Sequence, residues 1–240
     1  MKLNSLNLKL IIGLTYLVII SFGLYFLFSN FSISDLTSYT FIKENKGLIL
    51  QYKDNNIFFL AFVFLVITVL LNVLLCPIFL PTLVIGFIFG KWVGTLILVF
   101  GNTLGGVLLY LLAKTFFSEL IEKKFAIKFA NLKKLFNKNE MIYFMCFRFV
   151  GGGGTPFPIQ NVLPVIFNMS VKNYIIATFL GIIPATFVTV ALGSGIQNII
   201  DQNIELSFWS VFFSPEIYLP IIGFLILFIV AFVVKKIYFK

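Results

Sequence analysis

The chain has 240 residues, of which 60% are hydrophobic and only 11% are charged, with 18 Lys and Arg against 9 Asp and Glu. Soluble domains are about a quarter charged, so this composition excludes a water-soluble globule and indicates one polytopic membrane domain. In such a protein a lysine excess marks the cytoplasmic loops, and nucleic-acid binding is not expected.

Uncharged or nearly uncharged stretches follow one another along the chain, at 10–28, 57–90, 92–113, 141–171, 173–200 and 217–234. Because a helix crosses the hydrocarbon core with about 20 apolar residues, the first, third, fifth and sixth stretches each predict one transmembrane helix. Residues 10–28 follow Lys2 and Lys9 without a clear cleavage site and are interpreted as a retained anchor.

The second and fourth stretches have lengths that fit neither one crossing nor two. As a helix, 57–90 would reach roughly 50 Å, against a core of about 30 Å. Each stretch also carries helix breakers near its middle: Pro77 and Pro81 in one, where Cys76 is expected in the same turn, and GGGGTPFP at 151–158 in the other. Both therefore predict helix–break–helix hairpins, with Pro77 and Pro81 in a structural turn or, as the alternative, in contact with a ligand.

The lysine distribution favours hairpins that enter and leave on one side. If 57–90 crossed once and the amino terminus lay inside, the lysine-rich loop 114–140 would fall outside. With both hairpins re-entrant, that loop lies inside and the acidic segment 196–216 lies outside, as the positive-inside rule prefers. Inside are then Lys2, Lys9, Lys114, Lys123, Lys124, Lys128, Lys133, Lys134, Lys138, Lys172, Lys235, Lys236 and Lys240, and outside are Lys43, Lys46, Lys53 and Lys91.

These elements predict an all-α integral membrane protein with four transmembrane helices and two opposed re-entrant hairpins arranged as an inverted repeat, a common transporter plan. We expect an anchor and polar extracytoplasmic segment at 1–56, a core membrane domain at 57–195, and an outer loop with a last crossing at 196–240. Between the hairpins, 116–138 alternates lysines with apolar residues and predicts an amphipathic helix on the inner surface or, alternatively, a solvated connecting helix.

Arg148 is the ionisable residue within these embedded stretches, and an arginine there usually faces a polar cavity, a partner or a ligand. It is followed by Gly151, Gly152, Gly153, Gly154, Thr155, Pro156 and Asn161. Four consecutive glycines cannot hold a lipid-exposed helix, but their N–H groups and a guanidinium suit a phosphate. We therefore predict an anion site, with an arginine that snorkels to the surface and pairs with Glu140 as the alternative.

The embedded stretches contain no His, Asp or Glu, so a proton relay is not expected. The sequence has no nucleophile–base pair, metal cluster or nucleotide-binding loop, and we expect no enzymatic activity, no metal and no cofactor. Cys76 and Cys146 lie in apolar sequence and are interpreted as buried small side chains rather than a disulfide. The glycines between 86 and 106 are interpreted as helix-packing positions.

Residues 148–195, RFVGGGGTPFPIQNVLPVIFNMSVKNYIIATFLGIIPATFVTVALGSG, resemble the DedA / SNARE-associated Golgi protein family of VTT-domain membrane proteins. The resemblance rests on Arg148, Pro156, Phe157 and Asn161, on GIIPATF and LGSG, and it extends back through residues 81–114. It implies opposed re-entrant hairpins and lipid movement, since family members are associated with scrambling phospholipids or returning polyprenyl-phosphate carriers. The DedA branch has acidic residues near its first hairpin, linked to proton-motive coupling, whereas CPIFLPT at 76–82 has none, which favours passive scrambling or a different substrate.

Together these features predict a membrane lipid transporter, a scramblase or flippase, in which an anionic headgroup passes through a polar groove between the hairpins. The alternatives are a transporter of a small anion or solute through the same cavity, and a non-transporting membrane scaffold. The expected partners are membrane lipids with anionic headgroups. The expected location is a bacterial inner membrane, with both termini cytoplasmic.

Overall fold

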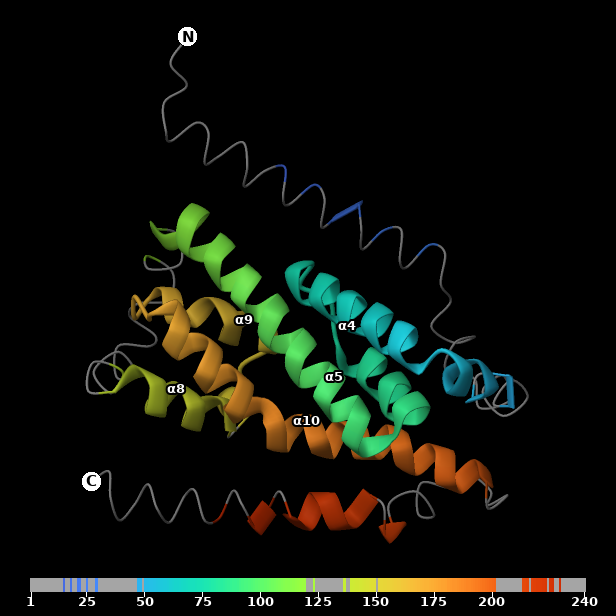
Figure 1. Ribbon diagram of the computed structural model, residues 1–240. Coiled ribbons are helices and arrows are strands. Elements are labelled where there is room, and N and C mark those ends of the chain that lie inside the picture. Colours follow the sequence, from blue (N-terminus) through green and yellow to red (C-terminus); the bar gives the residue numbers. More distant parts are fainter. Residues whose placement is uncertain are drawn as a thin grey trace.

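The computed structural model of the protein describes residues 51–119, 139–149 and 151–201, together with scattered positions between 15 and 50, residues 123 and 136, and positions between 213 and 229. Within the three continuous ranges every regular element is a helix. Two long helices, α5 and α10, run through the middle of the molecule, and shorter helices pack beside them (Figure 1).

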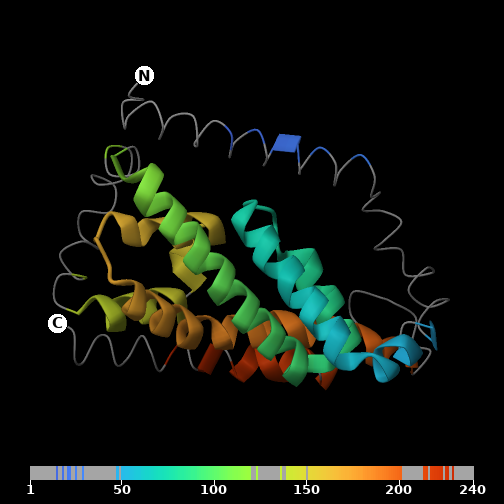
Figure 2. The ribbon, with the colours of Figure 1, turned by 45° about the horizontal axis from the view of Figure 1, so that its top comes forward.

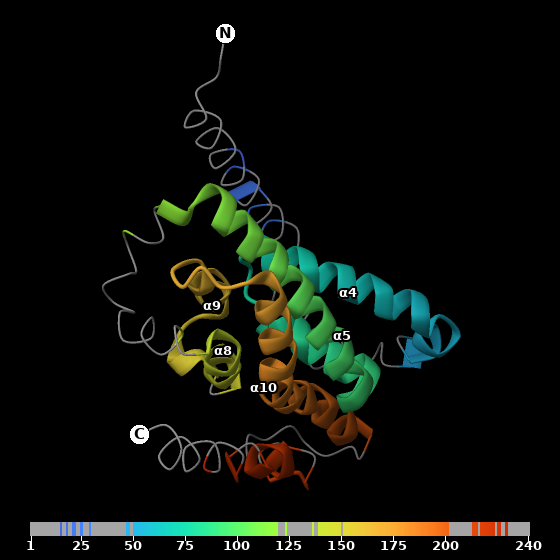
Figure 3. The same cartoon turned by 60° about the vertical axis from the view of Figure 1, so that its left-hand side comes forward.

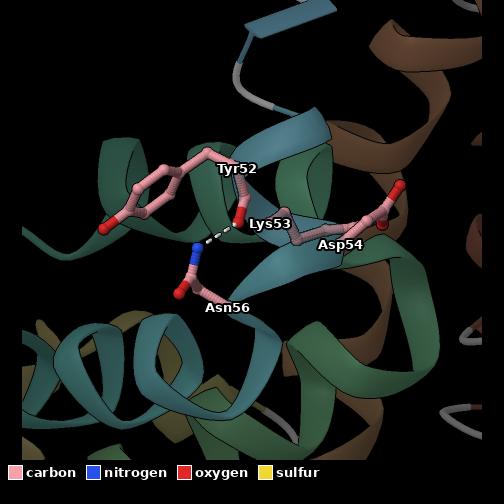
Figure 4. A network of polar contacts seen from close by, with 4 residues as sticks. All are labelled: Tyr52, Lys53, Asp54 and Asn56. Carbon is pink, nitrogen blue, oxygen red and sulfur yellow. Dashed lines mark hydrogen bonds and ion pairs between the residues drawn. The ribbon is translucent and has the colours of Figure 1, made fainter.

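Helix α4, Ile57–Val73, is the first arm of a helical hairpin. A short helical stretch precedes it and is broken at Asn56, whose Nδ2 donates to the Tyr52 carbonyl at 3.2 Å beside a Lys53–Asp54 ion pair of 3.0 Å (Figure 4). Helix α4 contains neither glycine nor proline and is apolar on all sides, which suits a helix surrounded by apolar groups. It ends where Leu75 adopts a positive φ of 59°, followed by a proline that cannot continue the helix.

Helix α5, Phe79–Phe116, is interrupted at Gly90, whose φ of 73° and ψ of 175° are not helical. Residues 79–89 turn back beside α4, and residues 91–116 then run in the direction of α4 again (Figures 1 and 2). Contacts fix this arrangement: Phe64 meets Phe89 edge-on at 5.6 Å, while Gly101 lies against Thr68 and Gly105 against Asn72. The segment 57–89 is therefore a helix–turn–helix hairpin whose two ends lie at the same end of the rod 91–116.

A second hairpin is built from α8, Glu140–Phe149, the 3-10 turn η1, Gly151–Gly154, helix α9, Phe157–Val162, and the 3-10 turn η2, Leu163–Val165. Its two ends are joined by Glu140, whose Oε1 accepts hydrogen bonds from the Ser170 backbone N–H at 3.1 Å and from Asn173 Nδ2 at 2.6 Å. The chain thus enters and leaves this hairpin at one place, and the next helix starts there.

Helix α10, Val171–Asp201, runs antiparallel to the rod 91–116 of α5. Three ring pairs mark the register along the two helices: Trp92 with Phe187 at 5.1 Å, Phe100 with Phe179 at 5.1 Å, and Tyr110 with Tyr174 at 4.9 Å. Figure 3 brings α8 and α9 forward, beside the end of α10 that follows the second hairpin. The other end of α10 crosses residues 79–89, with Gly86 against Val190 and Gly193 against Leu83.

The two hairpins approach the rod 91–116 from opposite ends. The first hairpin joins the rod at Gly90. The second has its mouth beside the far end of the rod, where the Tyr110 hydroxyl and Lys114 Nζ both donate to the Met169 carbonyl. Both hairpin tips reach the middle of the rod, because Asn72 bonds to Asn102 at 2.8 Å and Gly106 lies against Asn161 and Tyr174.

The outer surface of the described helices is apolar. Phe58 is 89% exposed and Trp92 70% exposed, and large apolar side chains of α4, α5 and α10 are exposed beside them. The segments Pro81–Phe116 and Val171–Ile196 are long and apolar enough to cross a membrane, with mean hydropathies of 2.2 and 2.3. Residues 91–116 alone span about 39 Å at 1.5 Å per residue, which is enough for the hydrocarbon core.

The predicted all-helical fold is thus confirmed for the described residues, and long apolar helices lie where crossings were expected, at 92–113 and 173–200. The number of four crossings, the re-entrant placement of the hairpins within a bilayer and the division at residues 56 and 195 stay predictions. The predicted crossings 10–28 and 217–234 and the amphipathic segment 116–138 lie largely outside the described residues. Phe136 of the last segment is described and packs in the second hairpin against Phe144 and Phe167.

Candidate functional site

Arg148 lies in the last turn of α8 and is only 1% exposed. Its Nη1 donates to Gln160 Oε1 at 3.2 Å, and its Nη2 donates to Asn161 Oδ1 and to the Tyr174 hydroxyl, the latter at 3.1 Å. The tip of the second hairpin is therefore folded around the guanidinium, with one partner from α10. We call Arg148, Gln160, Asn161 and Tyr174 the arginine cluster.

Aromatic rings enclose the same guanidinium. Its central carbon lies 4.8 Å from the ring centre of Phe144, 4.9 Å from that of Phe157 and 5.8 Å from that of Tyr174. Each ring face attracts a cation, and the attraction is stronger where water is excluded. Stacking between Tyr174 and Tyr110 extends this aromatic wall to α5.

The charge of Arg148 is not neutralised by any carboxylate among its described partners, which are two amides and a hydroxyl. Glu140, which the snorkelling alternative paired with Arg148, is instead bonded to Ser170 and Asn173 at the hairpin mouth. A buried, unpaired charge costs several kcal/mol in real proteins. The site therefore has an uncompensated positive charge that favours an anion.

Unsatisfied donors gather on the elements that meet at Arg148. Among the described residues, the buried side-chain atoms without a hydrogen-bond partner are Arg148 Nε, Asn161 Nδ2, Thr103 Oγ1 and Thr178 Oγ1. Thr103 is one helical turn from Gly106, which abuts Asn161, and Thr178 is one turn from Tyr174. The two nitrogens belong to the arginine cluster and can only donate, so the cluster suits an acceptor such as a phosphate oxygen.

The glycine run forms a tight turn rather than free backbone. Gly151 and Gly152 have φ values of 67° and 70°, a region that side chains with a Cβ rarely adopt. The Thr155 N–H closes the turn on the Gly152 carbonyl at 3.1 Å. Gln160 Nε2 donates to the carbonyls of Gly151 and Thr155, at 3.2 and 2.6 Å, so the turn wraps around this amide.

The structure brings several predicted site residues together. Arg148 and Asn161 are in direct contact, and Gly151, Gly152 and Thr155 reach Arg148 through Gln160. Gly153 and Gly154 complete the turn, and Pro156, which is exposed, precedes α9. Cys76 and Pro77 lie in the turn of the first hairpin, whereas Pro81, also predicted in that turn, lies in the first turn of α5. No described hydrogen bond or ring contact joins the three residues to Arg148. Cys76 is buried as predicted, whereas Cys146, also predicted to be buried, is exposed.

Two members of the cluster were not predicted from the sequence, Gln160 and Tyr174. Gln160 directly precedes Asn161 in the motif and is a polar residue within an apolar stretch, which is a signal that points to it. Tyr174 follows 26 residues after Arg148, and only the fold places it there. Gly106, interpreted as a packing residue, lies directly against Asn161 and Tyr174, and with Tyr110 it brings α5 into contact with the cluster.

A second buried polar contact links the first hairpin to α5. Asn72 Nδ2 donates to Asn102 Oδ1 at 2.8 Å and to the Thr68 carbonyl at 2.9 Å. All three residues are buried. No group of three or more His, Cys, Asp or Glu side chains in the described parts of the chain could hold a metal ion. The arginine cluster itself offers hydrogen-bonding groups and the positive charge of Arg148.

Comparison with known proteins gives a match to the VTT domain over residues 76–195, a range that contains the turn of the first hairpin and the arginine cluster. The chain is similar to the Transmembrane protein 41 homolog of Dictyostelium discoideum, at 31% identity over 169 residues, which are 66% of this chain and 48% of that protein. The chain thus spans about half the length of this curated relative. No solved structure matches.

Proposed function

The chain belongs to the VTT-domain family of membrane proteins, and from this premise we propose that it moves lipids from one leaflet of a membrane to the other. The observation that carries the proposal is the convergence of two opposed hairpins on the middle of one crossing helix, with an uncompensated arginine at the tip of the second. In a bilayer, backbone breaks are tolerated only where protein or a polar cavity surrounds them. A pair of opposed breaks is therefore a suitable mid-membrane polar path.

The path proposed here treats the two parts of a lipid differently. The headgroup passes between the hairpin tips, where donors are in excess, while the acyl chains stay along the apolar outer faces of α4, α5 and α10. Arg148 and Asn161 bind the headgroup phosphate, since a guanidinium offers a planar pair of donors that matches two phosphate oxygens. The substrate is a phospholipid or a polyprenyl phosphate.

Movement is passive in this proposal. The embedded parts of both hairpins have no Asp, Glu or His, which are the residues that build proton relays in transporters. A gradient of lipid between leaflets then sets the direction. We further propose a bacterial inner membrane with the lysine-rich loop 114–140 on the cytoplasmic side, because lysines gather inside.

The test uses the full chain, purified and reconstituted into vesicles with fluorescent phospholipids whose outer-leaflet copies can be quenched. Faster loss of fluorescence than in protein-free vesicles, for phosphatidylglycerol more than for phosphatidylcholine, is expected. Uptake of radiolabelled phosphate without lipid movement would make the chain a small-anion transporter. Neither activity in a folded, reconstituted protein would make it a scaffold and overturn the proposal.

A further inference from the structure

The side-chain amide of Gln160 forms hydrogen bonds through both its nitrogen and its oxygen. Its Nε2 donates to Gly151 and Thr155, the two ends of the glycine loop (residues 151–155), and its Oε1 accepts from Arg148 Nη1. Because carbonyls only accept and a guanidinium only donates, this orientation of the amide is the one that satisfies every partner. One side chain, 6% exposed, therefore ties the loop to the arginine.

The backbone of the loop is fitted to that amide. A Cβ built on Gly152 would lie 2.2 Å from Gln160 Cδ and Nε2, whereas one built on Gly151 would meet nothing within 4 Å. The two glycines share a positive φ, so an alanine at either position would have comparable backbone strain. The two positions differ in the room that is available for a side chain. A side chain at position 152 would therefore collide with Gln160, onto which the loop closes directly.

In this arrangement both outer nitrogens of the guanidinium donate hydrogen bonds within the arginine cluster, whereas Nε has no partner. Nη1 is held by Gln160, and Nη2 by Asn161 and Tyr174. A phosphate that binds end-on through Nη1 and Nη2 replaces neutral oxygens at these two nitrogens, and Gln160 supplies the one at Nη1. When Gln160 leaves Arg148, the same movement frees the carbonyls at both ends of the glycine loop.

We propose that Gln160 is a positioning residue that couples closure of the glycine loop to access of anions to Arg148. The inference rests on the proposed function, since it concerns the same anion site. We call the arrangement in the structure the closed state, in which Gln160 Oε1 occupies the position at Nη1 that a phosphate oxygen would take. In the open state the loop is released, and the headgroup takes that place.

The experiment uses the fact that Arg148 is the single arginine of the chain. Phenylglyoxal modifies guanidinium groups, so peptide mass spectrometry of the treated full chain reads the accessibility of one side chain. Gln160→Met removes all three hydrogen bonds at similar length and should raise the modification rate at least about tenfold, the equilibrium equivalent of one charge-assisted hydrogen bond. Gln51→Met, the same change at an exposed position, should leave the rate unchanged.

Two glycine variants test the coupling without changing Gln160. Gly152→Ala pushes a methyl group into the amide and should also raise the rate, whereas Gly151→Ala carries comparable backbone strain without the collision and should raise it much less. Thermal unfolding and size-exclusion profiles show which variants are folded. Equal rates in Gly152→Ala and Gly151→Ala, or a wild-type rate in folded Gln160→Met, would overturn the proposal.

A third measurement tests whether the exposed Arg148 binds anionic lipids. In Gln160→Met, vesicles that contain phosphatidylglycerol should slow the modification of Arg148 relative to phosphatidylcholine vesicles, because the exposed guanidinium then binds the anionic headgroup. Equal rates in the two vesicles would show that opening gives anions no access and would overturn the inference. Modification does not depend on transport, so failure of lipid movement in the wild-type assay refutes the proposed function separately.

Discussion

At the scale of single residues, Arg148 meets two opposed requirements. Its burial is costly because no carboxylate among its described partners neutralises it. Three oxygens and three aromatic rings recover part of that cost. In the proposed function the remainder favours an anionic ligand, so that Arg148 would have a structural role and a binding role together.

Two substitutions of Arg148 distinguish the effect of its positive charge from the effect of its planar guanidinium group. Arg148→Lys keeps the charge but loses the planar fork that reaches Gln160 and Asn161 at the same time, so transport of anionic lipid should fall markedly. Arg148→Gln should reduce it by about 10- to 150-fold, the equivalent of one charge-assisted hydrogen bond. Vesicle assays measure both, with Lys172→Gln as an exposed charge-removal control. Wild-type rates in both Arg148 variants would contradict the anion site.

Tyr174 tests the cluster itself. Its hydroxyl accepts from Arg148 and donates to Asn161, each at 3.1 Å, while its ring stacks on Tyr110. Tyr174→Phe keeps the ring and removes the hydroxyl, so the free energy of unfolding should fall by about 0.5–1.5 kcal/mol per lost hydrogen bond. Unfolding in detergent measures the change, and Tyr52→Phe, at a 53% exposed ring, should have little effect. Equal stability of the two variants would show that the hydroxyl contributes nothing.

At the scale of elements, glycines decide how closely the first hairpin approaches α10. Gly86 and Gly193 sit where residues 79–89 and α10 cross, and their missing side chains are replaced by backbone of the facing helix. Small residues allow such close approach in membranes, where packing rather than the hydrophobic effect holds helices together. Both hairpins therefore pack against α10 as well as against α5, and these two helices connect them.

Alanine at these crossings should destabilise the fold. A Cβ would lie 2.2 Å from the Val190 carbonyl oxygen at position 86 and 2.1 Å from the Leu83 carbonyl oxygen at position 193. Backbone cannot rotate away, so overpacking should cost on the order of 1–3 kcal/mol and outweigh a helix-propensity gain of about 1 kcal/mol. Thermal unfolding in detergent measures it. Gly223→Ala, with nothing within 4 Å, is the control, and a variant at 86 or 193 as stable as this one would contradict the crossing.

At the scale of the whole molecule, orientation in the membrane follows from how many times the chain crosses. If both hairpins are re-entrant, as the sequence predicts, the lysine-rich loop and both termini lie inside and the segment after α10 lies outside. In a variant without Cys76 and Cys146, single cysteines at Lys128 and Lys236 should be protected from an impermeant thiol reagent in intact cells, while one at Asp201 should react. Reaction at position 128 from outside would contradict this topology, because the lysine-rich loop would then lie on the wrong face.

The sequence by itself determined that the chain is helical and apolar, and it determined where the helices are interrupted. Apolar stretches too long for one crossing and too short for two, with Pro77 in one and Gly151–Gly154 in the other, predicted helices that turn back, and the chain does turn back at both places. Arg148 and Asn161 were predicted as one site and are in contact. Such features are local, since they depend on backbone propensity and on the cost of a charge in hydrocarbon.

Only the tertiary structure decided what Arg148 faces. Sequence reasoning offered a phosphate or Glu140, whereas the folded chain surrounds the guanidinium with Gln160, Asn161 and Tyr174 and bonds Glu140 to the start of α10. It also made Gly106 and Gly152 contact points rather than generic small residues. Spacing along the chain does not specify these contacts, because they arise where helices distant in sequence cross, and the angle and depth of each crossing are set by packing of all side chains together.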